Sequence, residues 1–141
     1  MVALLDVNVL IALLDVDHIH HRQATAWFSA YASNGWASCP ITENGCIRVM
    51  SQTGYPNPLP TAAVVERLGQ ATRHRRHRFW PDDISLLDRK TLSGPILGPR
   101  QVTDLYLIAL AVKHQGCLAT FDDNIPVTLI ARATKRHLIV I

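Results

Sequence analysis

The sequence predicts an α/β fold in which a central parallel sheet is covered by helices on both faces. Several short runs are wholly apolar, without the polar alternation of a half-exposed strand, and such runs are typical of strands buried on both faces. Helical patterns alternate with these runs along the chain, as the crossovers between parallel strands require. The first run covers residues 2–5 and ends at Asp6, where the chain turns into a short helix.

Five strands and five helices are expected on this basis. The strands are predicted at residues 2–5, 36–39, 78–80, 117–120 and 138–141. The helices are predicted at residues 9–14, 18–34, 42–50, 61–71 and 103–115. The last three begin at threonines that we interpret as N-caps, because a threonine hydroxyl accepts hydrogen bonds from free amides; these are Thr42, Thr61 and Thr103. The fourth helix is expected to bury an apolar stripe made of Val64, Val65, Leu68 and Ala71.

The length of 141 residues suits one domain, residues 1–141, and 48% hydrophobic residues are enough for a real core. A formal net charge of +3 is compatible with a polyanionic partner without being evidence for one. The three cysteines are an odd number at wide spacing, which argues against a disulfide framework or a zinc site. We expect buried free thiols in a reducing cytosol.

The apolar N-terminus does not have the pattern of a signal peptide. It lacks a basic segment, and Asp6 and Asn8 interrupt the apolar run. No stretch approaches the roughly 18 apolar residues of a membrane span. A cytoplasmic protein with no membrane association is therefore expected.

Four carboxylates, far apart in the sequence, are predicted to meet at one edge of the sheet. Asp6 and Asp122 follow strands, and the carboxyl ends of parallel strands form the ligand-binding edge of such sheets. Glu43 and Asp104 each follow a predicted capping threonine, so they should begin helices at the same edge. Asp104 should point inward, because it shares a helix face with apolar residues.

Such a cluster has a chemical consequence. Carboxylates close together repel each other, and some would hold a proton unless a cation balanced their charge. Oxygen ligands suit Mg²⁺ or Mn²⁺, and these ions can activate water and stabilise charge on a phosphoryl group. Helix N-termini beside the acids favour ionised carboxylates and can help to hold a phosphate.

Four segments of the chain resemble the PIN domain, and more closely the VapC toxins of VapBC toxin–antitoxin systems. Together they extend in the family's order from Leu4 to Asp122, and as a set they are highly specific. The segments are residues 4–10 (LLDVNVL), 41–45 (ITENG), 103–111 (TDLYLIALA) and 119–122 (ATFD).

The resemblance implies a three-layer α/β/α sandwich and an endoribonuclease that needs Mg²⁺ or Mn²⁺ and cuts structured RNA such as tRNA or rRNA. It also implies a homodimer and a VapB-type antitoxin that inserts a C-terminal segment near the acidic site, often with an arginine. By motif position, the catalytic acids would be Asp6, Glu43, Asp104 and Asp122.

The same motif positions imply finer roles for several residues. The metal ligands would be Asp6, Asp104 and Asp122, with Glu43 joining directly or through water. Asn8 and Thr120 would support the site. Asp123 follows Asp122 and is an alternative for its role, although the spacing from Thr120 favours Asp122.

Other polar groups allow more than one interpretation. Four arginines in a basic run could hold RNA phosphates, meet an acidic antitoxin surface, or form a solvated helix end; they are Arg73, Arg75, Arg76 and Arg78. Phe79 and Trp80 after them are expected in the core. The histidines at 18, 20 and 21 and the turn at residues 135–137 are expected in solvent.

Competing functions can be weighed on the same residues. A haloacid dehalogenase-type phosphatase needs a second Asp two residues after the first, where this chain has Asn8. A receiver domain needs adjacent acids near the first strand, and Asp6 has none. A catalytically inactive PIN domain that only binds RNA or an antitoxin remains an alternative, because ligands alone do not prove turnover.

Overall fold

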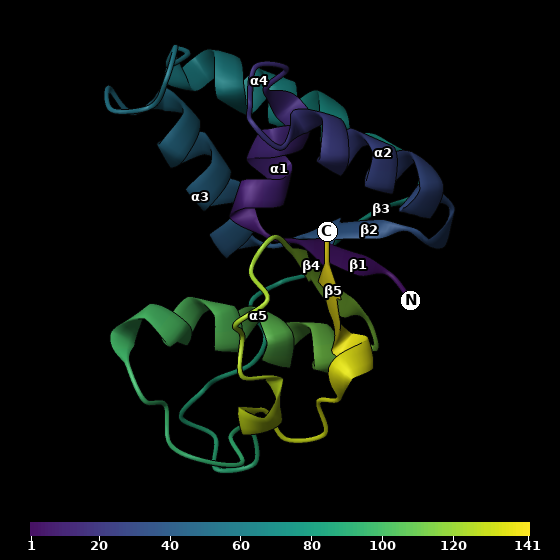
Figure 1. Cartoon of the computed structure of the whole chain (residues 1–141), viewed down its shortest axis with the longest axis vertical. Helices are drawn as coiled ribbons and strands as arrows, with labels where there is room; N and C mark the ends of the chain where they lie inside the picture. The colour runs from purple at the N-terminus through teal and green to yellow at the C-terminus, as the bar shows by residue number, and fades with distance from the viewer.

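The computed structural model describes all of residues 1–141 and contains one five-stranded parallel sheet between two layers of helices (Figure 1). Its spatial order is β3-β2-β1-β4-β5, and every neighbouring pair is parallel. The strands are β1 (Ala3–Leu5), β2 (Trp36–Ser38), β3 (His77–Phe79), β4 (Cys117–Thr120) and β5 (Leu138–Val140). The predicted α/β/α sandwich is therefore confirmed, with strand ends within one residue of those expected.

Helices cover both faces of this sheet, four on one side and one on the other (Figure 1). The four on one face are α1 (Val7–Leu14), α2 (His21–Tyr31), α3 (Pro40–Ser51) and α4 (Thr61–Thr72). On the opposite face lies α5 (Val102–Lys113), together with the long connections on either side of it. None of these helices is long and apolar enough to cross a membrane.

The sheet separates two hydrophobic cores, and alternate residues of β1 enter different ones. Ala3 and Leu5 pack with the helices α1, α3 and α4, whereas Leu4 packs with α5 on the other face. Successive side chains of a strand point to opposite faces, so a strand covered on both faces must be apolar throughout. This is why β1, β2 and β4 show no polar alternation. All three cysteines are buried and free, as predicted.

The three predicted threonine N-caps were wrong. Helix α3 begins at Pro40 with Cys39 as its N-cap, because proline's fixed backbone angle suits the first helical position. Thr42 lies inside the first turn, where its hydroxyl accepts the Cys39 N–H at 3.0 Å. The N-cap of α4 is Pro60, and α5 continues directly from a short 3₁₀ turn that ends at Gln101.

Four expectations about burial also need correction. Phe79 is 53% exposed because β3 is an edge strand, whereas its neighbour Trp80 is buried as predicted. Val65 lies on the exposed side of α4 and does not belong to its apolar stripe. His137 is buried rather than solvated, because its ring accepts the Thr134 N–H at 2.9 Å. The three histidines at 18, 20 and 21 are half-buried.

Gly116 allows the chain to enter β4 beside β1. A Cβ atom there would lie 2.5 Å from the backbone oxygen of Val2 and 2.5 Å from the Trp80 ring. We expect Gly116→Ala to lower the free energy of unfolding by about 2 kcal/mol, as overpacking does. Gly69→Ala is the matched control, because nothing lies within 4 Å and alanine favours the helix by up to about 1 kcal/mol. Urea denaturation measures both, and equal effects would contradict the close approach.

Candidate active site

Asp6 is held at the carboxyl end of β1 by two hydrogen bonds. Its Oδ1 accepts the Val7 N–H at 2.7 Å, which makes Asp6 the N-cap of α1. Its Oδ2 accepts the Thr120 hydroxyl at 2.8 Å. Thr120 is buried at the end of the neighbouring strand β4, and its oxygen also accepts the Asp122 N–H at 3.2 Å. One threonine hydroxyl therefore joins the segments that carry Asp6 and Asp122.

Three aspartates share one electrostatic environment. Burial, and then the negative charges of Asp6 and Asp122, raise the pKa of Asp104 to about 6. The pKa of Asp6 is also raised, mainly by burial and to a smaller extent by Asp122, although its two hydrogen bonds oppose the shift. Asp6, Asp104 and Asp122 thus lie near enough for their negative charges to raise the pKa values of Asp6 and Asp104, although burial is the larger cause.

Glu43 lies to one side of this group. It is in the first turn of α3, and neither Asp6 nor Asp104 owes its raised pKa to Glu43. One of its oxygens, Oε1, accepts the Ser38 hydroxyl at 2.6 Å. The Ser38 oxygen is in turn 2.7 Å from Nε2 of His77 on β3. Sequence reasoning did not identify either Ser38 or His77, although a serine within the otherwise apolar β2 was the available signal.

The remaining predicted supporting residues differ in their surroundings. Asn8 is exposed on the first turn of α1. Asp123 is exposed as well, and its side chain accepts a hydrogen bond from Asn124 at 2.8 Å. Asp122, but not Asp123, contributes to the raised pKa values of Asp6 and Asp104. Asp122 is exposed as well, but its backbone N–H donates to the Thr120 hydroxyl that also holds Asp6.

Helices α1 and α3 approach each other closely beside these acids. A Cβ atom at Gly45 would lie 2.7 Å from Cγ2 of Val7, so the approach depends on the missing side chain. Val7 directly follows Asp6, and Gly45 lies two residues after Glu43. The contact therefore sets how near the two acid-bearing segments can lie.

The donor set matches a hard divalent cation in chemistry but does not form a ready-made cage. Burial and, to a smaller extent, neighbouring negative charges raise the pKa values of Asp6 and Asp104, and carboxylate oxygens are the ligands that Mg²⁺ and Mn²⁺ prefer. However, no three histidine, cysteine, aspartate or glutamate side chains lie close enough together to hold a metal ion as they stand.

The basic segment, residues 73–78, follows α4 and includes the first two residues of β3. Its four arginines are exposed; they are Arg73, Arg75, Arg76 and Arg78. None of them is in an ion pair, because the ion pairs of the structure are those of Asp83 with Lys113 and His114. These arginines are therefore free to meet an anionic partner.

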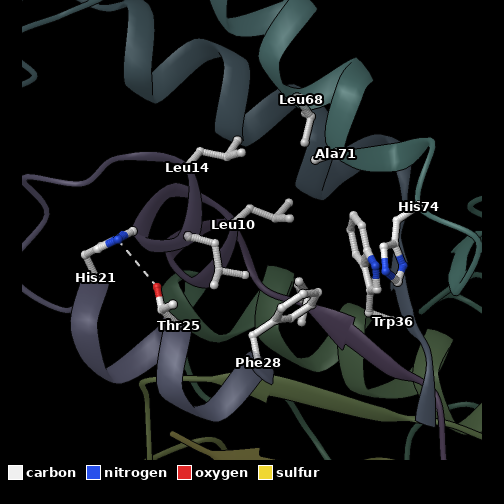
Figure 2. A pocket seen from close by; sticks show the side chains of 11 residues that line it. Leu10, Leu14, His21, Thr25, Phe28, Trp36, Leu68, Ala71 and His74 are labelled. Atoms are coloured by element: carbon white, nitrogen blue, oxygen red, sulfur yellow. Dashed lines mark hydrogen bonds between the residues drawn. The ribbon is translucent and has the colours of Figure 1, made fainter. Parts of the chain in front are cut away.

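An apolar pocket of about 370 Å³ lies between α1, α2, α4 and the sheet (Figure 2). Leu10, Leu14, Phe28 and Leu68 are among its lining side chains, and none of the four acids is. The indole nitrogen of Trp36 is the one buried side-chain nitrogen or oxygen without a hydrogen-bond partner. With so few polar groups, this pocket is unsuited to phosphodiester chemistry, which leaves the acidic edge as the candidate active site.

Comparison with known proteins agrees with this fold. The family model of the PIN domain matches residues 3–128. Ribonuclease VapC44 of Mycobacterium tuberculosis is 51% identical over 139 residues, which are 98% of each chain. Ribonuclease VapC39 of the same organism is 45% identical over 128 residues, covering 86% of this chain and 89% of the relative.

A solved structure supports the same fold at lower sequence similarity. It is the crystal structure of VapBC2 from Rickettsia felis bound to a DNA fragment from their promoter, with a TM-score of 0.58 and 18% identity. The match covers 94% of this chain and 98% of the other. The chain therefore belongs to the PIN-domain family and, within it, to the VapC ribonucleases.

The raised pKa of Asp104 predicts a pH-dependent cost to stability in the metal-free protein. The Asp104 carboxyl binds its proton more tightly in the folded state than in the unfolded state, where its pKa is near 3.8. The free energy of unfolding therefore falls as pH rises from about 4 to about 6. Asp104→Asn should recover at most about 3 kcal/mol at pH 7.5 and little at pH 4.

Urea denaturation in EDTA at both pH values measures this effect. Asp17→Asn is the matched control, because Asp17 is exposed and its carboxylate accepts no hydrogen bond. An Asp104→Asn variant that is destabilised equally at both pH values would contradict the electrostatic origin of the cost.

Proposed function

We propose that this chain is the toxin of a VapBC toxin–antitoxin pair, acting as a Mg²⁺- or Mn²⁺-dependent endoribonuclease on structured RNA such as tRNA or rRNA. The observation that carries the proposal is the group of three aspartates at the carboxyl edge, where burial and mutual repulsion raise the pKa of Asp104 to about 6. The 51% identity to Ribonuclease VapC44 along almost the whole chain supports the same conclusion.

Each residue of the acidic edge would have its own role in this reaction. Asp6, Asp104 and Asp122 hold the divalent ion, and Glu43 joins directly or through water. When bound, the ion supplies positive charge against the phosphodiester and lowers the pKa of water. Thr120 keeps the Asp6 carboxylate oriented by donating to its Oδ2, and Asn8, exposed two residues after Asp6, would support the site from the first turn of α1.

The four arginines of the basic segment would hold RNA phosphates during this reaction. They are exposed and have no acidic partner within the chain. We further propose that the chain acts as a single PIN domain, forms a homodimer, and binds a VapB-type antitoxin. The structural relative from R. felis, whose structure is of VapBC2, supports an antitoxin partner.

A second candidate is an inactive PIN domain that only binds RNA or an antitoxin. The absence of three metal-binding side chains in close proximity favours this alternative. The presence of all four acids favours the nuclease, because a binding module has no need to keep aspartates at a cost to stability. Cleavage assays separate the two.

The decisive experiment is to incubate the purified chain with tRNA and rRNA in Mg²⁺, in Mn²⁺ and in EDTA. We expect discrete cuts that leave 5′-phosphate and 3′-hydroxyl ends and that disappear in EDTA. Asp104→Asn should lower the rate by at least about 100-fold, since a carboxylate that would hold the divalent ion is lost, whereas Asp17→Asn should not. Products with 2′,3′-cyclic phosphates would contradict metal-activated water, and binding without any cleavage would favour the inactive module.

The basic segment can be tested by the salt dependence of RNA binding. In the Asp104→Asn background, Arg75→Gln with Arg76→Gln should reduce the slope of log affinity against log salt by about 1.4, or roughly 0.7 for each phosphate contact. The control is Arg89→Gln with Lys90→Gln, which removes the same charge from an exposed loop. Equal slopes for the two double variants would show that charge alone, and not this segment, matters.

A further inference from the structure

We infer that Ser38 and His77 are positioning residues for Glu43, which they hold through two consecutive hydrogen bonds; this inference rests on the proposed nuclease function. Ser38 is the last residue of β2 and is fully buried. Its Oγ lies 2.6 Å from Oε1 of Glu43 and 2.7 Å from Nε2 of His77. The three side chains come from α3, β2 and β3, so the arrangement depends on the tertiary fold.

The direction of the two hydrogen bonds follows from the chemistry of the groups. An ionised carboxylate only accepts hydrogen bonds, so the single hydroxyl proton of Ser38 must be donated to Glu43. The Ser38 oxygen then accepts from His77, which must carry its proton on Nε2. The two hydrogen bonds therefore run in one direction, from the imidazole to the hydroxyl and from the hydroxyl to the carboxylate. They require the proton of His77 to be on Nε2.

His77 is itself held in place by packing. Its ring lies 4.4 Å from the ring of Trp36, centroid to centroid, with a tilt of 55°. The ring lies on the edge strand β3 beside Trp36 of β2 and is half-buried. This burial lowers the pKa of His77 and favours the neutral ring, whereas the Glu43 charge and the Thr72 backbone carbonyl oppose the shift. Donation to Ser38 requires a proton on Nε2, which the neutral Nε2–H ring and the imidazolium both carry, whereas the neutral Nδ1–H ring lacks it.

The consequence concerns where Glu43 can act. A glutamate side chain has several rotatable bonds, and the hydrogen bond to Ser38 restricts it to the β2–β3 side of the site. Its other oxygen takes part in none of the hydrogen bonds of the structure, so it is free to meet an ion or a water molecule. Losing such a supporting hydrogen bond at a metal site typically costs about 10- to 100-fold in affinity or activity.

The hydrogen-bonded chain can be observed without any nuclease assay. Long-range ¹H–¹⁵N NMR on the folded protein reports which ring nitrogen of His77 carries the proton. We expect the Nε2–H form in the wild type and a change in the ring ¹⁵N shifts in Ser38→Ala. An Nδ1–H form, or ring ¹⁵N shifts of His77 that are unchanged in Ser38→Ala, would overturn the inference.

Kinetic measurements test whether Ser38 and His77 act through Glu43. Ser38→Ala and His77→Phe should each lower kcat on RNA by about tenfold with little change in KM, and His77→Gln should restore part of the loss because its amide can donate. In a Glu43→Gln background both losses should disappear. Ser51→Ala is the matched control, since that hydroxyl donates to the backbone of its own helix.

The outcomes are distinguishable from those of the proposed function. If Ser38→Ala and His77→Phe still lower kcat in the Glu43→Gln background, these residues have a general structural role. That result would overturn the positioning role and leave the nuclease proposal intact. A wild-type chain that cleaves no RNA would overturn the nuclease proposal and, with it, the kinetic part of this inference. The NMR result would still decide whether the hydrogen bonds exist.

Discussion

The parallel pairing of the five strands is the constraint on which the rest of this structure depends. Because all strands run in one direction, their carboxyl ends meet at the same edge of the sheet. The register of β1 against β4 pairs Leu5 with Ala119, which brings Asp6 beside Thr120. The hydroxyl of Thr120 can then serve Asp6 and the backbone of Asp122 together. A shift of one residue would break both contacts and send the side chains to the opposite face.

The same edge concentrates negative charge that the fold does not neutralise. The carboxylates of Asp6 and Asp104 are partly removed from water, and the two hydrogen bonds that Asp6 accepts do not compensate fully for its burial, as its raised pKa indicates. A chain selected for stability alone would replace them with apolar or neutral residues. Local conflict of this kind, inside an otherwise consistent fold, is typical of a functional site.

The fold was predictable from the sequence because burial on both faces leaves a clear signal. Strands such as β1 and β4 must be apolar throughout, and their ends follow from Asp6 and from the polar residues after Thr120. Helix starts were less predictable, because a threonine near a helix start can cap the helix or lie inside its first turn. Thr42 does the latter, since Pro40 already begins the helix.

The acids of the site were also predictable in part, because strand ends determine the edge to which Asp6 and Asp122 belong. The link from Glu43 through Ser38 to His77 was not predictable, since it depends on the side chains of three separate elements. Edge position explains another failure. Phe79 is a large apolar residue of the kind usually found in a core. However, β3 has a neighbouring strand on one side only, and the Phe79 ring remains exposed.

The contact between Gly45 and Val7 limits how far apart two segments of the candidate active site lie. Glycine at this position permits α1 and α3 to meet at van der Waals distance, and the widths of the two helices then determine the gap between the Asp6 and Glu43 segments. Any larger residue at 45 would act as a wedge between the helices and widen that gap while leaving the sheet and all four carboxylates in the sequence. The spacing of the acidic residues thus depends on a residue that is not itself acidic, so intact acidic motifs alone do not guarantee an intact site.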